Sequence, residues 1–437
     1  MKKILFASTA LVAASMMHAG AAEAADKIKL DVGGFSKWWV VGAWQSSAFS
    51  GATASGTPAG NNVVTPTNGS GQRANVDVKG DNEIWFSGNT TLDNGLKVGV
   101  FVSMEAGGHS DLTTDVIDAS YAWIEGGFGK VIGGTAPNGT ALIHVQAPDA
   151  ANGTVGASQI GNNFTIIKPT SVMGMNQIVG WSTSSNTTAI VTDDKAEKLT
   201  YVAPSFYGLT LGASYIPNVT RQDVRTTPLA RAEAFGGGAL YANTFGPVGV
   251  KASAGYVWVD LSAAGNLGVT NFTQAAFGTQ LSYAGFTLGG SYQRARQDNS
   301  QGGVNGLSNT VIAATSTTVL SGTVNLSATK GGVALDFGGD AYDVGLQYAT
   351  GPYAISVGYF HSGVNGIMNP TLTNGGKQDT IDLYQASGKY NLGPGVDALA
   401  TVGYIDYKDQ RKGLMGVSDS AYENSGWAAM TGLSLTF

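Results

Sequence analysis

The chain has 437 residues, of which 63 are glycine, none is cysteine and 12% are charged, with a formal net charge of −6. Glycine in a helix interior costs about 1 kcal/mol relative to alanine, so this composition disfavours a helical protein, and the recurring aromatic residues disfavour a disordered one. The missing cysteine excludes disulfides, cysteine-based zinc sites and thiol nucleophiles, and the negative charge argues against nucleic acid as a partner.

The first 24 residues have the pattern of a Sec-type signal peptide. Lys2 and Lys3 form a basic start, an apolar run follows over 4–17, and Ala22-Glu23-Ala24 is a small-x-small cleavage site. Cleavage before Ala25 leaves residues 25–437 as the mature chain. Beyond residue 24 no apolar run reaches the roughly 18 residues of a transmembrane helix, so a mature chain in a membrane must form a closed β-barrel.

Seven short turn signals punctuate the mature chain, and alternating apolar and polar residues flank each of them. Every signal supplies a residue that tolerates positive φ or a proline that presets a turn. The signals are Asp93-Asn94-Gly95, Gly127-Phe128-Gly129, Tyr207-Gly208, Gly246-Pro247, Ala284-Gly285, Gly351-Pro352 and Gly393-Pro394-Gly395.

Longer polar stretches alternate with the short turns. They lie at 46–78, 107–115, 137–196, 218–231, 261–271, 299–336, 363–377 and 411–424. Seven short and eight long connections join 16 strands, and their alternation makes neighbouring strands antiparallel, with all short turns and both termini at one end. Bacterial outer-membrane barrels have this layout, with turns in the periplasm and loops outside. The sequence therefore predicts an all-β fold, a transmembrane 16-stranded antiparallel β-barrel.

The two faces of each predicted strand differ in polarity. Between 96 and 105, the even-numbered residues are apolar, and Lys97, Ser103 and Glu105 lie opposite them, with Phe101 as an exception. The segments 250–258, 286–293 and 353–359 alternate in the same way. This pattern predicts an apolar exterior in lipid and a polar lumen. Arg294 and Arg296 share the parity of the apolar face, and we expect them near the outer rim.

A soluble β-sandwich also alternates, but its apolar face is the buried one. Here the polar face is mostly small or neutral, and the apolar strips tend to end in Tyr, Trp or Phe, as interfacial girdles do. The last strand ends on Phe437, with Leu435, Leu433 and Trp427 on the same face. We expect this strand to pair with the strand that begins near Ile28, because a barrel leaves no open edge.

Three parts of the chain carry a resemblance to a known family: the glycine-containing strand 28–34, the segment 118–134 (DASYAWIEGGFGKVIGG) and the closing strand to Phe437. Together they resemble the general porins of Gram-negative outer membranes over the whole mature chain. The resemblance implies a homotrimer in outer-membrane lipid and lipopolysaccharide. It further implies a terminal strand that the barrel-assembly machinery recognises, and a third external loop that folds into the barrel and narrows the pore.

The third loop, about 137–196, departs from the family pattern. The resemblance implies an acidic third loop that faces a cluster of arginines, but residues 136–191 carry only Asp149 and Lys168 as fixed charges. The seven arginines are scattered at 73, 221, 225, 231, 294, 296 and 411. We therefore expect a weak transverse field at the constriction and weak ion selectivity.

The predicted function is passive diffusion of small hydrophilic solutes and ions through a water-filled pore. A substrate-selective channel, for example for a sugar, is the main alternative, because the third loop carries many hydroxyl and amide groups. A structural or adhesive barrel with a blocked lumen is a third. The candidate pore-lining residues, each of which also fits a rim or loop position, are Lys37, Glu83, Lys97, Glu105, Asp118, Asp149, Lys168 and Lys251.

Enzymatic chemistry is not expected from the residue pattern. The mature chain has three histidines, His109, His144 and His361, and their spacing suggests no Ser-His-Asp triad. Asp193-Asp194 fits solvated loop charges better than a metal site. The glycine runs 236–238 and 338–339 lack the strand-turn-helix setting of a phosphate loop. We expect no catalytic residue, metal or cofactor.

Overall fold

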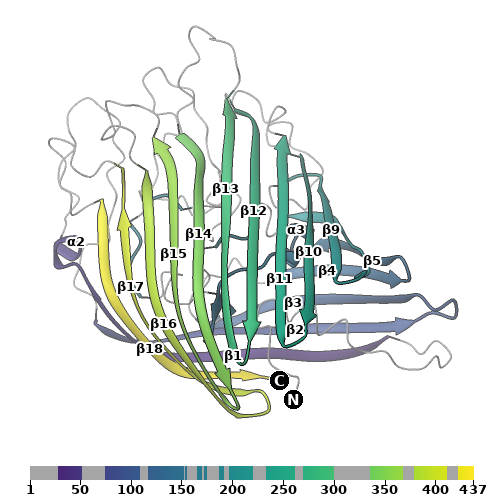
Figure 1. Cartoon of the computed structure of the whole chain (residues 1–437), viewed down its shortest axis with the longest axis horizontal. Helices are drawn as coiled ribbons and strands as arrows, with labels where there is room; N and C mark the ends of the chain where they lie inside the picture. Colours follow the sequence, from purple (N-terminus) through teal and green to yellow (C-terminus); the bar gives the residue numbers. More distant parts are fainter. Residues whose placement is uncertain are drawn as a thin grey trace, which may run out of the picture.

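A computed structural model describes most of the mature chain, and its central feature is a closed antiparallel β-barrel (Figure 1). The described residues are 28–51, 74–108, 117–151, 153–154, 165–169, 172–174, 187–190, 196–219, 233–260, 269–299, 335–367, 378–410 and 422–437. The predicted signal peptide, His109 and Asp193-Asp194 lie outside these ranges.

Sixteen strands form the barrel, as predicted, and each pairs with its neighbour along the chain. They are β1 (Lys29–Gln45), β2 (Val76–Thr91), β3 (Lys97–Gly108), β4 (Ile117–Gly126), β5 (Gly129–Thr135), β8 (Glu197–Val202), β9 (Leu209–Ile216), β10 (Glu233–Phe245), β11 (Val248–Asp260), β12 (Val269–Tyr283), β13 (Phe286–Asn299), β14 (Leu335–Thr350), β15 (Tyr353–Ile367), β16 (Asp379–Gly393), β17 (Val396–Lys408) and β18 (Glu423–Thr436). Four short elements lie outside the barrel sheet: α2 (Ser47–Gly51), α3 (Gly139–Ile143), β6 (Pro148–Asp149) and β7 (Gly153–Thr154). Among the described residues, no helix has the length and apolar character needed to cross a membrane.

The barrel closes where β1 meets β18, as expected from the terminal strand. Their register runs from Phe35 opposite Thr436 to Gln45 opposite Gly426. The ladder extends to the last residue, because the Gly34 N–H donates to the Phe437 carbonyl at 2.9 Å and the Phe437 N–H donates to the Gly34 carbonyl at 3.1 Å. The pairing leaves neither strand with an open edge.

All seven predicted short turns connect neighbouring strands, and those between β10 and β17 lie at one end of the barrel (Figure 1). Two of them are two-residue turns with positive φ at both central residues: 49° and 87° at Tyr207 and Gly208, and the same values at Ala284 and Gly285. These angles are those of a type I′ turn, whose twist matches that of the flanking strands.

Exposure alternates along the strands as the polarity pattern predicts. On β13, Phe286 and Leu288 are half exposed, whereas Thr287 between them and Ser291 further along the strand are buried. Arg294 and Arg296 are exposed at the far end of the same strand from its short turn. The exposed apolar face is the lipid face, and the polar face points into the barrel.

The wall is not equally tall all round. β5, β8 and β9 have 7, 6 and 8 residues, whereas the strands from β10 to β18 have 13 to 16. A transmembrane strand needs about 9–11 residues to cross the hydrocarbon. The strands β5, β8 and β9 are therefore shorter than strands that must meet lipid across the whole hydrocarbon layer.

The Ala284-Gly285 turn generates a testable prediction. A Cβ at Gly285 would lie 2.6 Å from the Ala349 carbonyl oxygen, and φ is +87°. We expect Gly285→Val to lower the free energy of unfolding by about 1–2 kcal/mol, the cost of a left-handed conformation for a residue with a side chain. Urea unfolding of protein refolded into vesicles measures the change. Gly237→Val is the control, because its nearest non-bonded heavy atom is 3.8 Å from the Cβ position; equal losses in both variants would contradict the prediction.

Candidate channel site

The loop between β5 and β8 lies against the inward face of the barrel. α3 packs on β9, β10 and β11, and β6 packs on β13, β14 and β15. The loop is attached by backbone N–H groups that donate to wall hydroxyls: Gly139 to Ser214 at 2.8 Å, Val145 to Ser253 at 2.9 Å, and Ala150 to Ser356 at 2.8 Å. Because the opposite face of these strands carries the exposed apolar side chains, the third loop lies inside the barrel.

Asp343 on β14 is one of the points at which this loop is attached to the wall. Its buried carboxylate accepts hydrogen bonds from Ser291 Oγ at 2.7 Å, the Ala147 N–H at 3.0 Å and Thr188 Oγ1 at 3.2 Å. Thr188 also contacts His144 Nε2 at 3.2 Å. Neutral donors from the wall and from two separate parts of the loop therefore meet at one carboxylate.

The close approach of loop and wall requires glycine at one position of β12. A Cβ at Gly278 would lie 1.7 Å from the Val145 carbonyl oxygen, far inside contact distance. Any side chain there would push the loop away from β11 and β12. The small inward residues of this wall thus serve to seat the loop.

Apolar side chains complete the contact further along the loop. Ile166, Val172 and Ile190 belong to one buried cluster with inward residues of β1, β15 and β17, among them Trp39, Phe360 and Tyr407. Ile167 extends the contact to β18, because its carbonyl accepts from Asn424 Nδ2 at 2.8 Å. The described loop segments therefore cover the inward face from β9 round to the upper part of β1.

Asp149, one of the two charges of the third loop, is buried against the wall, which corrects the sequence-based expectation that it lines the pore. Asp149 is only 3% exposed, and its carboxylate accepts from Gln385 Nε2 at 2.6 Å and from the Ala151 N–H at 3.1 Å. Burial raises the pKa of Asp149 above its ordinary value. The reason for the correction is that this charge is used to attach the loop to β16.

Lys168 is also directed into the loop. Its Nζ donates to the Val172 carbonyl at 2.6 Å, and burial lowers its pKa to about 8. His144 is buried as well, which lowers its pKa to about 4 and leaves the ring neutral at pH 7. Asp149 and His144 therefore present little charge to the lumen, whereas Lys168, which is half-buried and largely protonated at pH 7, directs its charge to a loop carbonyl.

Charged side chains instead lie on the inward face of β1 to β3, across the barrel from most of the loop. Lys37 Nζ pairs with Asp81 Oδ2 at 3.3 Å and lies 4.0 Å from the centre of the Phe35 ring. Glu83 and Glu105 are directly opposite each other in the β2–β3 register. All four charged residues are half-buried, so part of each side chain remains accessible to solvent.

The comparisons with known proteins agree with this geometry. Residues 7–410 match the family described as Gram-negative porin. The chain belongs to the Gram-negative porin family. Among curated proteins, no match is found.

Solved porin structures share the fold. A porin refined at 1.8 Å resolution is 15% identical, with a TM-score of 0.52, and covers 94% of this chain and 100% of its own. OmpT of Vibrio cholerae in its trimer form is 13% identical with a TM-score of 0.52, and the anion-selective porin from Comamonas acidovorans is 14% identical with a TM-score of 0.51. Each also covers 94% of this chain and 100% of its own. The porin described here is thus an outer-membrane channel for passive diffusion.

The remaining sequence candidates have different positions in the porin. Lys97 lies opposite Glu125 in the β3–β4 register, on the inward face. Lys251 shares the inward parity of the buried Ser253 on β11. Asp118 lies at a bulge on β4, where the register passes from Ser103 opposite Ala119 to Met104 opposite Ile117. At a bulge the alternation along the strand does not fix the face that a side chain occupies, so Asp118 stays a candidate from the sequence alone.

Sequence reasoning missed several residues of the inward face, among them Asp81, Asp343, Glu125 and Lys130. Lys130 Nζ lies 3.9 Å from Glu125 Oε2 and 4.1 Å from the centre of the Trp123 ring. Strand parity alone places Asp343 inward, since Tyr342 and Val344 beside it are apolar. The role of Asp343 in attaching the third loop could not be predicted, because no local sequence pattern shows where the loop lies.

Removal of the buried charge of Asp149 should stabilise the porin at neutral and higher pH. A carboxyl with a raised native pKa binds its proton more tightly in the folded chain, so its stabilisation is present at low pH and lost as the pH rises through the native pKa. We expect Asp149→Asn to unfold at higher urea than the wild type at about pH 8, and the difference to vanish near about pH 4.

Asp340→Asn is the matched control, because Asp340 is three residues from Asp343 on the outward parity of β14. This variant should show the same urea midpoint as the wild type at both pH values. A lower midpoint for Asp149→Asn at about pH 8 would mean that the ionised carboxylate is needed by its donors, and would contradict the prediction.

Proposed function

We propose that solutes pass between the docked third loop and the inward face of β1 to β3, and that small hydrophilic solutes and ions cross without strong selection. The half-buried Lys37, Asp81, Glu83 and Glu105 on that face are the observation that supports the proposal most directly. Lys37 offsets one of the three carboxylates there, so we expect no more than a modest preference for cations. Lys97 and Lys251 remain candidates for the lining of the same lumen.

Bilayer recordings test the pore and its lining. We expect purified protein to produce stepwise conductance, with a reversal potential in a salt gradient far from the ideal value for either ion. Glu83→Gln with Glu105→Gln removes two lumen carboxylates and should shift the reversal potential toward anion preference. Asp340→Asn, on the lipid face, should leave it unchanged.

The outcomes of this experiment are distinct. Protein that inserts and gives no conductance steps would contradict the channel and favour a structural barrel. A reversal potential near the ideal value for one ion would contradict weak selectivity. An unchanged reversal potential in the double variant would remove Glu83 and Glu105 from the lining.

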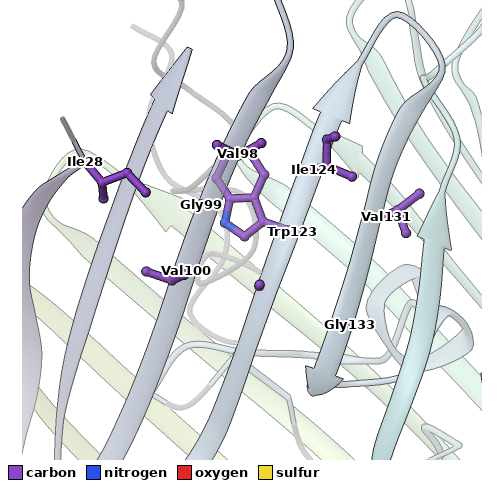
Figure 2. Close-up of a pocket in the computed structure, with 9 residues that line it drawn as sticks. Ile28, Val98, Gly99, Val100, Trp123, Ile124, Val131 and Gly133 are labelled. Atoms are coloured by element: carbon purple, nitrogen blue, oxygen red, sulfur yellow. The ribbon is translucent and has the colours of Figure 1, made fainter. Parts of the chain in front are cut away.

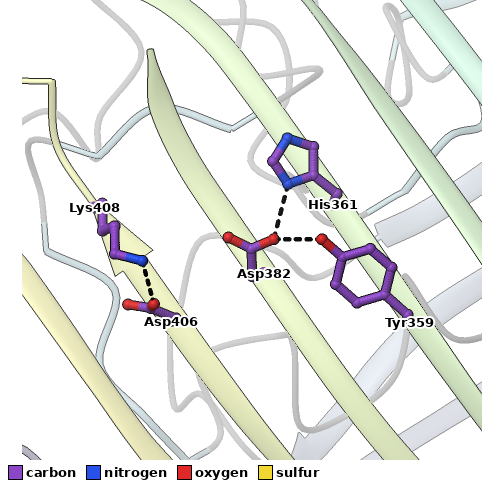
Figure 3. A network of polar contacts seen from close by, with 5 residues as sticks. All are labelled: Tyr359, His361, Asp382, Asp406 and Lys408. Carbon is purple, nitrogen blue, oxygen red and sulfur yellow. Dashed lines mark hydrogen bonds and ion pairs between the residues drawn. The ribbon is translucent and has the colours of Figure 1, made fainter. Parts of the chain in front are cut away.

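We propose that this chain has no enzymatic activity and needs no cofactor. The described His–Asp contact, between His361 Nδ1 and Asp382 Oδ1 at 2.8 Å, lies on the outward face of β15 and β16 (Figure 3). Asp382 Oδ1 also accepts from the Tyr359 hydroxyl at 2.6 Å, so the carboxylate is shared between two donors. A position in the membrane interface suits lipid contact better than hydrolysis of a soluble substrate.

The same outward network supports a proposed contact with lipid and lipopolysaccharide. Tyr359, Tyr384 and Tyr404 form an outward aromatic row, and His361, Asp382 and Asp406 are the next outward residues toward the rim. Lys408, which pairs with Asp406, lies one step further (Figure 3). Aromatic belts mark the edge of the hydrocarbon, so this polar row is at the level of the lipid headgroups.

The two ends of the chain support proposals about export and assembly. We propose that residues 1–24 are a Sec-type signal peptide, removed before Ala25. The ring of Phe437 is 65% exposed on the lipid face, next to Leu435 and Leu433. An exposed aromatic strand end of this kind is suited to recognition by the barrel-assembly machinery.

We propose that the porin is a homotrimer and that the short wall forms the subunit contact. Strands too short to meet lipid along their whole length must be covered by protein. The outward face of β3 to β5 carries a shallow apolar groove of about 430 Å³, lined by residues that include Val98, Val100, Ala122, Ile124 and Val131 (Figure 2). Trimeric OmpT of Vibrio cholerae, which has the same fold, supports a second copy of this chain as the occupant.

Gly133, at the edge of this groove, tests the trimer. A Cβ there meets no heavy atom within 4 Å, so a large side chain fits the monomer. We expect Gly133→Trp to convert the trimer to monomers, as measured by light scattering of detergent-solubilised protein after size exclusion. Gly388→Trp is the control: it is outward on the tall wall, and its Cβ position is 4.0 Å from the nearest heavy atom. A trimeric Gly133→Trp protein would place the interface elsewhere.

A further inference from the structure

A row of aromatic rings crosses the inward face of four adjacent strands. Phe35 lies on β1, Trp85 on β2, Phe101 on β3 and Tyr121 on β4. The ring centres of Phe35 and Trp85 are 6.4 Å apart, and Phe101 stacks on Tyr121 at 5.1 Å. We call these four residues the ring row. Large aromatic side chains on the water-filled side of a barrel are unexpected, because the lipid face is where they gain from burial.

Trp85 lies across a glycine of the neighbouring strand. A Cβ at Gly33 would be 2.4 Å from Nε1 and 2.7 Å from Cε2 of Trp85. One face of the indole therefore covers the wall, and the side chain remains half-buried, with its other side toward the lumen. The wall itself holds the ring in place, so little side-chain entropy is lost when a solute stacks on it.

The third loop ends close to one end of the row. Leu142 of α3 and Tyr121 both pack against the small cluster of Trp123, Ile132 and Ala136. A solute that passes the loop on this side therefore meets Tyr121, and beyond the buried Phe101 it can reach Trp85 and Phe35.

Hydrogen-bonding groups flank the rings on the same face. Glu83 is two residues from Trp85, and Lys37 is two residues from Phe35 and pairs with Asp81 at 3.3 Å. Glu105 lies opposite Glu83 in the β2–β3 register. Carboxylate acceptors and one ammonium donor thus flank apolar ring faces, and the Lys37–Asp81 pair offsets part of the charge.

A pyranose ring has the complementary chemistry, with apolar C–H faces and hydroxyl groups around its edge. The faces stack on aromatic rings, and the hydroxyls bind carboxylates and ammonium groups. We propose that the ring row is a binding lane for neutral cyclic sugars. The proposal rests on the function proposed above, a lumen that passes solutes between the loop and this wall.

Sugar-dependent changes in ion current test the lane. We expect maltotriose, a linear trimer of glucose, to reduce the current through single channels in a saturable way. Sorbitol at the same concentration has the hydroxyl groups without a ring face and should cause no saturable block. Trp85→Ala should weaken the maltotriose block by about threefold to tenfold, the range expected for loss of one aromatic contact.

Trp38→Ala is the matched control on the same pair of strands. Trp38 lies across Gly80 of β2, with its Cζ3 3.0 Å from the Cβ position, but on the outward face. The Trp38–Gly80 contact is the outward counterpart of the Trp85–Gly33 contact. Removal of the Trp38 side chain should leave the maltotriose block unchanged. Trp85→Leu, which preserves an apolar side chain, serves as a second variant if Trp85→Ala does not insert.

The possible outcomes distinguish failure of the sugar-binding proposal from failure of the channel proposal. Normal conductance steps with no saturable block by maltotriose would overturn the lane and leave the channel intact, whereas absence of any steps would contradict the channel itself. Equal block in the Trp85 variant and the wild type would overturn the assignment to the ring row. Block by phenol but not by maltotriose would make the row a site for planar aromatic solutes and would overturn the sugar proposal.

Discussion

The structure depends on backbone hydrogen bonding across the seam between the first and last strands. In lipid an unpaired N–H or carbonyl costs several kcal/mol, so a sheet can cross a membrane only if it closes. Here the seam extends to the last residue, where Phe437 and Gly34 exchange both hydrogen bonds. Once the seam is fixed, the register of every strand is fixed, and with it the face that each side chain occupies.

Because side chains alternate with a period of two along each strand, the two faces of the sheet meet different requirements. Outward residues have one requirement, compatibility with lipid, and they are accordingly apolar with aromatic ends. Inward residues have two: those from β9 to β18 seat the third loop, and those from β1 to β3 face the remaining space. Serines and glycines serve the first task, because backbone N–H groups of the loop need acceptors and close approach. Half-buried charges and rings serve the second.

The fold could be predicted from the sequence because its signals are local. Each short turn contains its own glycine or proline, and each strand has its own alternation, so 16 strands follow from counting. The positions of Asp149 and Lys168 could not be predicted, because the direction of a loop side chain is set by what the loop rests on. The face of Asp118 could not be predicted either, because it lies at a bulge, where the alternation along the strand is broken.

The third loop of this porin is held in place differently from the charged third loop that the family resemblance implies. The position of a charged third loop would depend on its electrostatic interaction with the charges across the lumen. In this porin the loop is held by neutral donors around two buried carboxylates, Asp149 and Asp343, so its position depends little on the salt that screens surface charges. Accessible inward charges lie on β1 to β3, which belong to the rigid sheet, and further ones lie on β11, β16 and β17. Under the function proposed above, the wall would set what crosses the lumen, because its rings and ion pairs stay in register with the barrel, and the loop would narrow the space in front of it.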